Sequence, residues 1–185
     1  MIKLILFDAK SYDKESFDLV KGNNIDITYI ESKLNHTTVS LAKGYDAVCA
    51  FVNDTLDKEV IDKLYSYNIK LILMRSAGFN NVDLKACYKK IHVYRVPAYS
   101  PYAVAEHAFA LLLTSNRRIH KAYNRTKEYN FSIEGLTGMD LYDKTIGIIG
   151  TGKIGQIMIN IAKGFSMHVL AYDPYPNKDL DVTYV

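Results

Sequence analysis

The sequence of 185 residues contains no tryptophan and only two cysteines. Cys49 falls in an apolar, strand-like segment and Cys87 in a helix-like one, so the pair forms neither a disulfide framework nor a metal-ligand cluster. We therefore expect two reduced thiols that serve in packing, and no metal site.

Long apolar runs are missing too. No segment reaches the roughly 18 apolar residues that a membrane-spanning helix needs. The first apolar segment, residues 1–7, passes directly into Asp8 and predicts a buried strand instead of a cleavable signal. These absences predict a cytoplasmic protein without a membrane partner.

The chain also lacks a strong excess of one charge, since its formal net charge at pH 7 is +3. One basic cluster lies at residues 117–127, where it would suit either a nucleic-acid surface or the solvated C-terminal end of a helix. We favour the helix end, because positive charge there complements the helix dipole. We therefore expect no nucleic-acid partner.

Hydrophobic residues make up 49% of the chain, enough for one sizeable core or two small ones. Over residues 1–95, short apolar runs alternate with amphipathic segments, which is typical of a mostly parallel sheet built from βα units. The predicted strands are residues 3–7, 25–30, 47–52, 71–74 and 92–96. The predicted helices are residues 13–21, 37–43, 57–67 and 83–89. This half of the chain is therefore expected to be flavodoxin-like α/β.

Ligands of such sheets bind beyond the carboxyl ends of the strands. Three loops of this sequence meet that condition, residues 51–54, 75–81 and 97–100. We expect the ligand-binding residues of this half among them.

A long helix is predicted to start at Ser100 and Pro101, since serine suits the N-cap and proline the first helical position. We expect it to run to about residue 123, to be buried on most sides and to join two domains, because Glu106 and His107 are the only polar residues from 103 to 113. For these two side chains we favour partners inside a domain junction over a direct catalytic role. The next segment, residues 126–143, is a long connection typical of an interface arm.

The most specific local pattern is IGIIGTGKIG at residues 146–155. Its apolar, β-branched start predicts a buried parallel strand that leads into three glycines at G-x-G-x-x-G spacing. Gly150 permits a tight turn, Gly152 has no Cβ to block a pyrophosphate, and Gly155 lets the next helix pack closely on the strand. The pattern predicts a dinucleotide-binding βαβ unit.

The residues after the glycines fit the same unit. Apolar residues at helical spacing predict a helix over residues 154–163, with N-terminal amides that face the phosphates and Gly164 at its end. A second strand over residues 167–172 leads to Asp173, whose carboxylate would accept hydrogen bonds from the adenosine ribose and so favours NAD over NADP. A turn role for Asp173 is the alternative, because Pro174 follows it.

Four further segments carry a resemblance that covers essentially the whole chain: RSAGFNNVD (75–83), VPAYSP (96–101), AVAEHA (103–108) and FSIEGL (131–136). Together with the glycine pattern they resemble the D-2-hydroxyacid dehydrogenase family, and within it they are most similar to the fermentative bacterial enzymes that act on D-lactate. The resemblance implies that residues 1–100 begin a catalytic (substrate) domain. It implies that residues 101–185 begin a Rossmann NAD-binding domain, here incomplete, with the active site in the cleft between the two.

The resemblance also implies roles for individual residues. The backbone N–H groups of Ala77 and Gly78 would bind the carboxylate of a 2-keto acid. Phe51 and Tyr99 would form the wall of its methyl pocket, with the Tyr99 hydroxyl able to reach the carboxylate; loop packing is the alternative for these two rings. The cofactor would be NAD, held by Gly150, Gly152 and Gly155, by the amides of Lys153 and Ile154, and by Asp173.

The implied reaction is reversible hydride transfer from NADH to the carbonyl carbon of pyruvate, which gives D-lactate. In the family a histidine supported by a glutamate delivers the proton and an arginine binds the substrate, and all three would lie beyond residue 185. We therefore expect this chain by itself to be an inactive fragment of a longer enzyme, with an unpaired sheet edge and an exposed apolar face. A homodimer through the cofactor domain is also implied.

Two other functions stay open besides this implied reaction. The enzyme could prefer bulkier 2-keto acids such as 2-ketoisocaproate. The protein could instead be a non-enzymatic NAD-sensing adaptor, because some members of the family are transcriptional corepressors.

Overall fold

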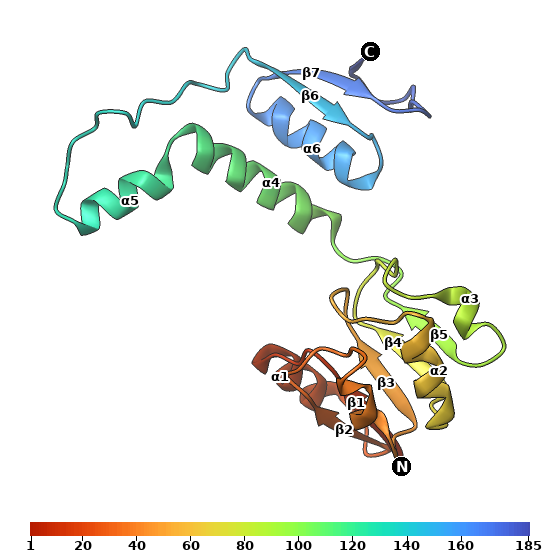
Figure 1. Cartoon of the computed structure of the whole chain (residues 1–185). Coiled ribbons are helices and arrows are strands. Elements are labelled where there is room, and N and C mark those ends of the chain that lie inside the picture. Colours follow the sequence, from red (N-terminus) through yellow and green to blue (C-terminus); the bar gives the residue numbers. More distant parts are fainter. The chain divides into compact units, whose positions relative to one another are not determined.

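The computed structural model describes residues 1–185, which separate into two compact units, Met1–Tyr99 and Ser100–Val185 (Figure 1). None of its helices combines the length and the apolar character needed to cross a membrane.

The first unit is built on a five-stranded sheet in which all strands run parallel. Its elements in chain order are β1 (Ile2–Leu6), α1 (Ser11–Val20), β2 (Ile25–Tyr29), the 3-10 helix η1 (Thr38–Ala42), β3 (Ala47–Ala50), α2 (Lys58–Ser66), β4 (Leu71–Met74), α3 (Leu84–Cys87) and β5 (His92–Arg95). The strand order β2-β1-β3-β4-β5 is the flavodoxin-like order. The predicted α/β class is confirmed.

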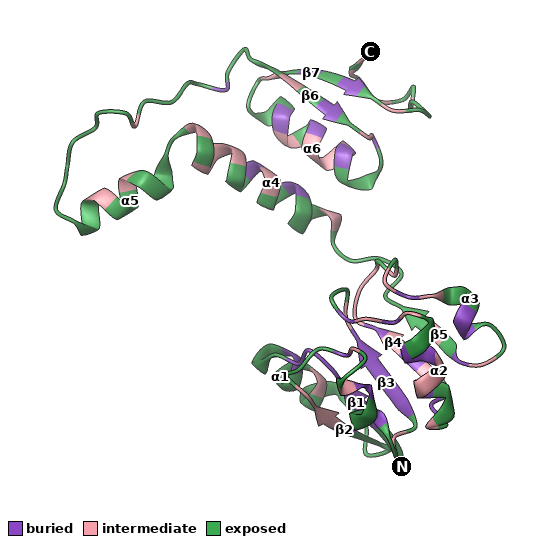
Figure 2. Cartoon of the chain, viewed as in Figure 1, coloured by how far each residue is buried: buried purple, intermediate pink, exposed green.

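Both faces of this sheet are covered, because successive side chains of a strand point to opposite sides. On one face Val48 and Ile72 pack with side chains of η1, α2 and α3 in the larger core. On the other face Cys49 belongs to a smaller core that Phe17 of α1 covers. Figure 2 shows β3 buried along its whole length, as is typical of the central strand of a parallel sheet.

The two thiols are buried and free. Burial raises the pKa of Cys49 to about 12 and that of Cys87 to about 11. Such thiols stay protonated at neutral pH and fill space in the core.

The carboxyl ends of the parallel strands share one edge of the sheet. The chain leaves β1, β3, β4 and β5 there at Phe7, Phe51, Arg75 and Val96. This edge brings together the loops in which the sequence predicts ligand-binding residues, as expected for a doubly wound sheet.

The second unit holds a three-stranded parallel sheet of order β6-β7-β8. Its elements are α4 (Pro101–Asn116), α5 (Ile119–Lys127), β6 (Thr145–Ile149), α6 (Lys153–Gly164), β7 (His168–Tyr172) and β8 (Thr183–Tyr184). The βαβ unit predicted around the glycine pattern is therefore present.

One face of this sheet is packed and the other is open. Phe109 of α4 and Ile159 of α6 pack with Ile148 of β6 in a single core, and the Phe109 ring stacks on Phe165 at 5.7 Å between centroids. Ile149 is 88% exposed. The prediction of a buried strand is thus correct for Ile148 and wrong for Ile149, because α4 and α6 cover one face only; the exposed apolar face expected from the sequence is present.

The helix predicted to run continuously from residue 101 to about residue 123 is in fact two helices. Arg118, between α4 and α5, has a φ of 54°, in the left-handed region that interrupts a right-handed helix. Ser100 and Pro101 occupy the predicted N-cap and first helical positions, but the Ser100 side chain makes no capping hydrogen bond.

The helix α4 is also less buried than the sequence predicts. Only Ala105 and Phe109 are buried, and Leu111 is 57% exposed. Glu106 and His107 are exposed and make no side-chain hydrogen bond. Neither side chain finds a partner within the second unit, because α6 packs against a single face of α4; partners inside a domain junction stay a prediction.

The long connection after α5 is tethered to the helices before it. Asn116 exchanges two hydrogen bonds with Met139, one from its Nδ2 to the Met139 carbonyl at 2.7 Å and one to its Oδ1 from the Met139 N–H at 3.1 Å. The Arg125 guanidinium donates to the carbonyl of Glu134 at 2.6 Å. Side chains of α4 and α5 thus hold a segment that has no helix or strand of its own.

Gly155 is the glycine on which the packing of α6 depends. An added Cβ there would lie 2.0 Å from the carbonyl oxygen of Gly150, so one backbone segment would have to move away from the other. We expect Gly155→Ala to lower the free energy of unfolding by about 1–3 kcal/mol or more, as overpacking does. Urea unfolding followed by circular dichroism measures the change.

Gly164→Ala is the matched control, because Gly164 lies in the same helix and its added Cβ would meet nothing within 4 Å. Alanine favours a helix over glycine by about 1 kcal/mol, so this variant is expected to be neutral or stabilised. Equal losses in the two variants would contradict the packing role of Gly155.

Candidate active site

A cavity of about 520 Å³ lies at the carboxyl edge of the first sheet. It is lined by Phe51, Val52, Arg75, Ser76, Ala77, Gly78, Val96 and Tyr99. The structure thus brings together all four residues to which the sequence analysis assigns substrate contacts. The volume falls within the range of small-molecule sites.

The loop after β4 presents two free backbone donors to this cavity. Neither the N–H of Ala77 nor that of Gly78 donates a hydrogen bond within the protein, and both residues line the cavity. The Ser76 hydroxyl donates to the carbonyl of Gly78 at 2.8 Å, which keeps the loop tight. Adjacent backbone N–H groups exposed by a tight loop are suited to an anion such as a carboxylate.

Arg75 anchors the start of this loop. Its Nη1 donates to the Asp13 carboxylate at 2.7 Å, and its Nη2 donates to the carbonyls of Phe7 and Asp8 at 2.7 and 3.2 Å. Its guanidinium carbon lies 5.0 Å from the centroid of the Phe51 ring. The side chains of Arg75 and Asp13 are 10% and 9% exposed, so the ion pair is buried. One side chain therefore joins β1, α1, β4 and one wall of the cavity.

The backbone of Phe51 is held on both sides. The buried Asp54 carboxylate accepts hydrogen bonds from the N–H groups of Phe51 and Leu34 at 2.6 and 2.7 Å. The Asn81 amide donates to the carbonyls of Phe51 and Asp54 at 3.0 and 2.9 Å. Burial raises the pKa of Asp54, although its two backbone hydrogen bonds act in the opposite direction. The ring of Phe51 is therefore presented from a fixed loop.

Tyr99, which also lines the cavity, is 61% exposed, and its hydroxyl makes no hydrogen bond within the protein. Arg75 and Tyr99 are the only titratable residues that line the cavity. These residues can bind and orient a small carboxylate, but the lining holds no histidine or carboxyl group that could transfer a proton near neutral pH.

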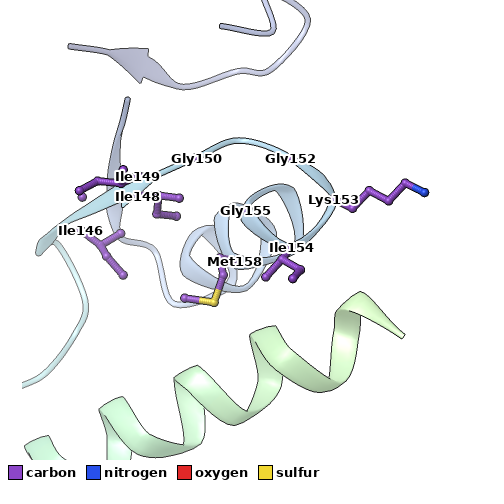
Figure 3. A pocket seen from close by; sticks show the side chains of 10 residues that line it. Ile146, Ile148, Ile149, Gly150, Gly152, Lys153, Ile154, Gly155 and Met158 are labelled. Atoms are coloured by element: carbon purple, nitrogen blue, oxygen red, sulfur yellow. The ribbon is translucent and has the colours of Figure 1, made fainter. Parts of the chain in front are cut away.

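A second cavity, of about 510 Å³, lies in the second unit beside the glycine loop. Figure 3 shows it bordered by β6, the loop and α6, with the Lys153 side chain directed outward. Gly150 has a φ of +90°, which makes the tight turn accessible mainly to glycine. A Cβ on Gly152 would meet nothing within 4 Å, so the protein leaves open the space that a phosphate would need.

The first turn of α6 has uncapped amides. Gly152 is its N-cap and has no side chain to offer, and Lys153 and Ile154 are its first two helical residues. Their N–H groups donate to no other part of the protein. The N-terminus of this 12-residue helix therefore has the donors and the dipole that bind a phosphate.

Asp173 follows β7 and holds the glycine loop. Its Oδ2 accepts hydrogen bonds from the N–H and the hydroxyl of Thr151 at 2.7 and 2.9 Å, and its Oδ1 accepts one from the N–H of Tyr175 at 2.9 Å. These hydrogen bonds, the one from the Thr151 N–H first, lower the pKa of Asp173. The carboxylate thus has the turn contact that the sequence leaves open, and it keeps acceptor capacity for a ligand, since a carboxylate offers about four lone-pair positions.

Sequence reasoning assigned no role to Arg75, Asp54 or Asn81, although all three hold the walls of the first cavity. The sequence feature that could have pointed to them is a polar side chain in a loop that follows a buried strand. That signal locates the edge of the sheet but does not tell which loop a side chain will bridge.

Comparison with known proteins finds one family for this chain. The family description "D-isomer specific 2-hydroxyacid dehydrogenase, catalytic domain" matches residues 4–162. A 2-hydroxyacid dehydrogenase homolog of Haemophilus influenzae is 50% identical over 178 residues, which are 95% of this chain and 54% of that protein.

Solved structures agree with this match. D-lactate dehydrogenase from Escherichia coli, in its apo form, is similar with a TM-score of 0.93 and 48% identity over 100% of this chain and 60% of that one. D-lactate dehydrogenase from Aquifex aeolicus, complexed with NAD and lactic acid, is similar with a TM-score of 0.79 and 31% identity over 98% of this chain and 55% of that one. The chain spans about half the length of the curated relatives that it matches.

The buried pair of Arg75 and Asp13 predicts a large effect of removing the cation alone. Arg75→Met leaves the Asp13 carboxylate buried without its partner, which typically costs about 3–5 kcal/mol. Arg75→Lys keeps the charge but loses the planar fork that serves three acceptors, so a smaller loss is expected. Urea unfolding measures both.

Lys63→Met is the control for this pair, because Lys63 forms an exposed ion pair with Glu59. Exposed pairs contribute about 0–1 kcal/mol. A loss in Arg75→Met no larger than in Lys63→Met would show that the buried pair does not hold the fold.

Asp54 predicts an unusual pH dependence. Since its pKa is raised in the folded protein, the folded state binds this proton more tightly than the unfolded state does. Its stabilising contribution is therefore complete below the ordinary value of 3.8 and is lost as the pH rises through the raised pKa. Unfolding free energies of the wild type and of Asp54→Asn, measured against pH, give the difference.

Asp62 supplies the opposite case, because hydrogen bonds from Lys58 and Lys90 lower its pKa to about 2. Its contribution is complete above 3.8 and is lost as the pH falls through that lower value. A carboxyl titration of Asp54 by NMR at or below that of Asp62 would refute the assigned burial effect.

Proposed function

The chain belongs to the D-isomer specific 2-hydroxyacid dehydrogenase family, and on that premise we propose that the whole protein is an NAD-dependent D-lactate dehydrogenase, which reduces pyruvate reversibly to D-lactate. The observation that carries the proposal is the cavity at the sheet edge, whose lining combines the unpartnered amides of Ala77 and Gly78 with the rings of Phe51 and Tyr99.

The proposed substrate contacts follow from the chemistry of that cavity. The N–H groups of Ala77 and Gly78 bind the carboxylate of the keto acid, since backbone donors suit a planar anion. The rings of Phe51 and Tyr99 enclose its methyl group, and the free Tyr99 hydroxyl is available to the carboxylate. We assign Arg75 no substrate contact in this scheme, because its Nη1 and Nη2 already donate to Asp13 and two carbonyls, and its Nε, which has no partner, is buried.

The proposed cofactor site lies in the second unit. The amides of Lys153 and Ile154 bind the pyrophosphate, and Asp173 accepts hydrogen bonds from the adenosine ribose. The ionised carboxylate of Asp173 would repel a 2′-phosphate, which supports NAD over NADP. A nicotinamide cofactor supplies the hydride in this class of reaction.

We propose that the histidine that delivers the proton lies beyond residue 185, as the family resemblance implies; the lining of the substrate cavity, which holds no histidine or carboxyl group, is consistent with this. We therefore propose that residues 1–185 bind and orient the substrate but do not turn it over alone.

A dehydrogenase for bulkier 2-keto acids is the second candidate. The observation that favours it is the size of the cavity, about 520 Å³, which leaves room beyond a three-carbon acid. A different orientation of the exposed Tyr99 ring would change the volume of the cavity. The backbone of Phe51 is held by Asp54 and would leave that volume unchanged.

The proposed homodimer through the cofactor unit has support from the connection after α5. Tyr129, Phe131 and Ile133 are 86%, 74% and 82% exposed. Large apolar side chains so exposed in one segment are typical of a surface that another chain covers.

Steady-state kinetics of the whole protein test the function. We expect oxidation of NADH with pyruvate, a higher kcat/KM for pyruvate than for 2-ketoisocaproate, and D-lactate as the product. In Asp173→Ala the preference for NADH over NADPH should fall about tenfold or more, because the repulsion of the 2′-phosphate is lost.

Asp179→Ala is the control for that variant, since Asp179 is an exposed acidic residue after β7 whose carboxylate makes no hydrogen bond. It should leave the cofactor preference unchanged. Absence of NADH oxidation with every 2-keto acid tested would refute the proposed function.

A further inference from the structure

The peptide groups that present the Ala77 and Gly78 donors are both held by the end of β5. The carbonyl of Ser76 accepts a hydrogen bond from the N–H of Val96 at 3.1 Å. The carbonyl of Ala77 accepts one from Nη1 of Arg95 at 2.9 Å. Two neighbouring residues therefore hold two successive carbonyls of the loop.

A held carbonyl sets the direction of the N–H in the same peptide group. In a planar trans peptide the C=O of one residue and the N–H of the next point in opposite directions. The Ser76 carbonyl is paired in this way with the Ala77 N–H, and the Ala77 carbonyl with the Gly78 N–H. Because both carbonyls turn toward Arg95 and Val96, both N–H groups turn away from them.

Arg95 is itself held in a defined position. Its guanidinium carbon lies 5.1 Å from the centroid of the Phe79 ring, and Nη1 makes two longer contacts, at 3.4 Å, with the carbonyls of Val96 and Pro97. Pro97 starts the segment that leads to Tyr99. The side chain of Arg95 thus contacts the loop with the two free amides and the segment that carries one ring of the cavity wall.

We propose that Arg95 is a positioning residue for the 2-keto acid, which orients the Ala77–Gly78 peptide so that the Gly78 N–H faces the substrate carboxylate. Arg95 does not touch the substrate. The proposal rests on the proposed function, because it requires these amides to bind a carboxylate. The contact from Val96 is a backbone one, so Arg95 is the part of the arrangement that a substitution can remove.

The test is the steady-state kinetics of Arg95→Met in the whole protein, with pyruvate and NADH. A misdirected Gly78 N–H loses a charge-assisted hydrogen bond that ground state and transition state share. We expect the KM for pyruvate to rise about tenfold, with kcat and the KM for NADH within about twofold of the wild type. Arg95→Lys can restore a single donor to the Ala77 carbonyl, so its KM for pyruvate should lie between those of the wild type and Arg95→Met.

Loss of a positive charge could also raise KM by weakening the attraction of an anionic substrate. Salt separates the two effects, because about 0.5 M salt screens attraction between exposed charges but leaves the direction of a peptide group unchanged. We therefore expect the ratio of KM between Arg95→Met and the wild type to persist at that salt concentration.

Lys70→Met is the matched control. Lys70 is exposed and its Nζ lies 5.1 Å from the centroid of the Tyr65 ring, much as Arg95 lies over Phe79. Lys70 precedes β4, whereas the loop with the free amides follows that strand. This variant removes the same charge and the same kind of stacking contact, and it should leave the KM for pyruvate unchanged.

Three results would overturn the proposal while the wild type reduces pyruvate: an unchanged KM in Arg95→Met, a KM ratio that disappears at high salt, or an equal rise in Lys70→Met. A wild type inactive with every 2-keto acid would overturn the proposed function together with this inference, so the two failures are distinguishable.

Discussion

The buried ion pair of Arg75 and Asp13 is the interaction on which the rest of the first unit's site depends. Two charges taken out of water are tolerated when they are paired in good geometry, and here the atoms meet at 2.7 Å with both side chains about nine-tenths buried. Nη1 and Nη2 of Arg75 both donate hydrogen bonds, and only its buried Nε has no partner. The pair fixes the end of β4 relative to the first turn of α1, and the carbonyls of Phe7 and Asp8 add the end of β1. The loop that carries the free amides therefore starts from a constrained point.

Both candidate sites present free backbone N–H groups, and this has a common consequence. A backbone donor has no side chain of its own to aim it, so its direction depends on what holds the neighbouring peptide groups. In the first unit Val96 and Arg95 donate hydrogen bonds to the carbonyls of Ser76 and Ala77. In the second, Asp173 holds the N–H and hydroxyl of Thr151 inside the glycine loop. In each case the free amides belong to residues other than the ones whose hydrogen bonds hold the loop.

Much of the fold could be predicted from local patterns. The parallel strands of the first unit begin and end within one or two residues of the predicted bounds, because apolar runs of that length, bounded by polar loops, are typical of buried strands. The prediction of a single helix over α4 and α5 is wrong at Arg118, which has a positive φ. The helical spacing of apolar residues does not reveal one residue in that conformation. The prediction that Ile149 is buried is also wrong. An apolar run shows that both faces of a strand are suited to burial, but it does not show that other elements cover both of them.

The sequence by itself determined the class of the fold, the glycine spacing of the second unit and the loops that line the cavity at the sheet edge, because each depends on residues only a few positions apart. Only the tertiary structure decided how those loops are held. Arg75 meets Asp13 across 62 positions of the chain and Arg95 meets Ala77 across 18. Such contacts follow from how parallel strands bring their carboxyl ends to one edge, and no local pattern of residues records which side chain will reach which carbonyl there.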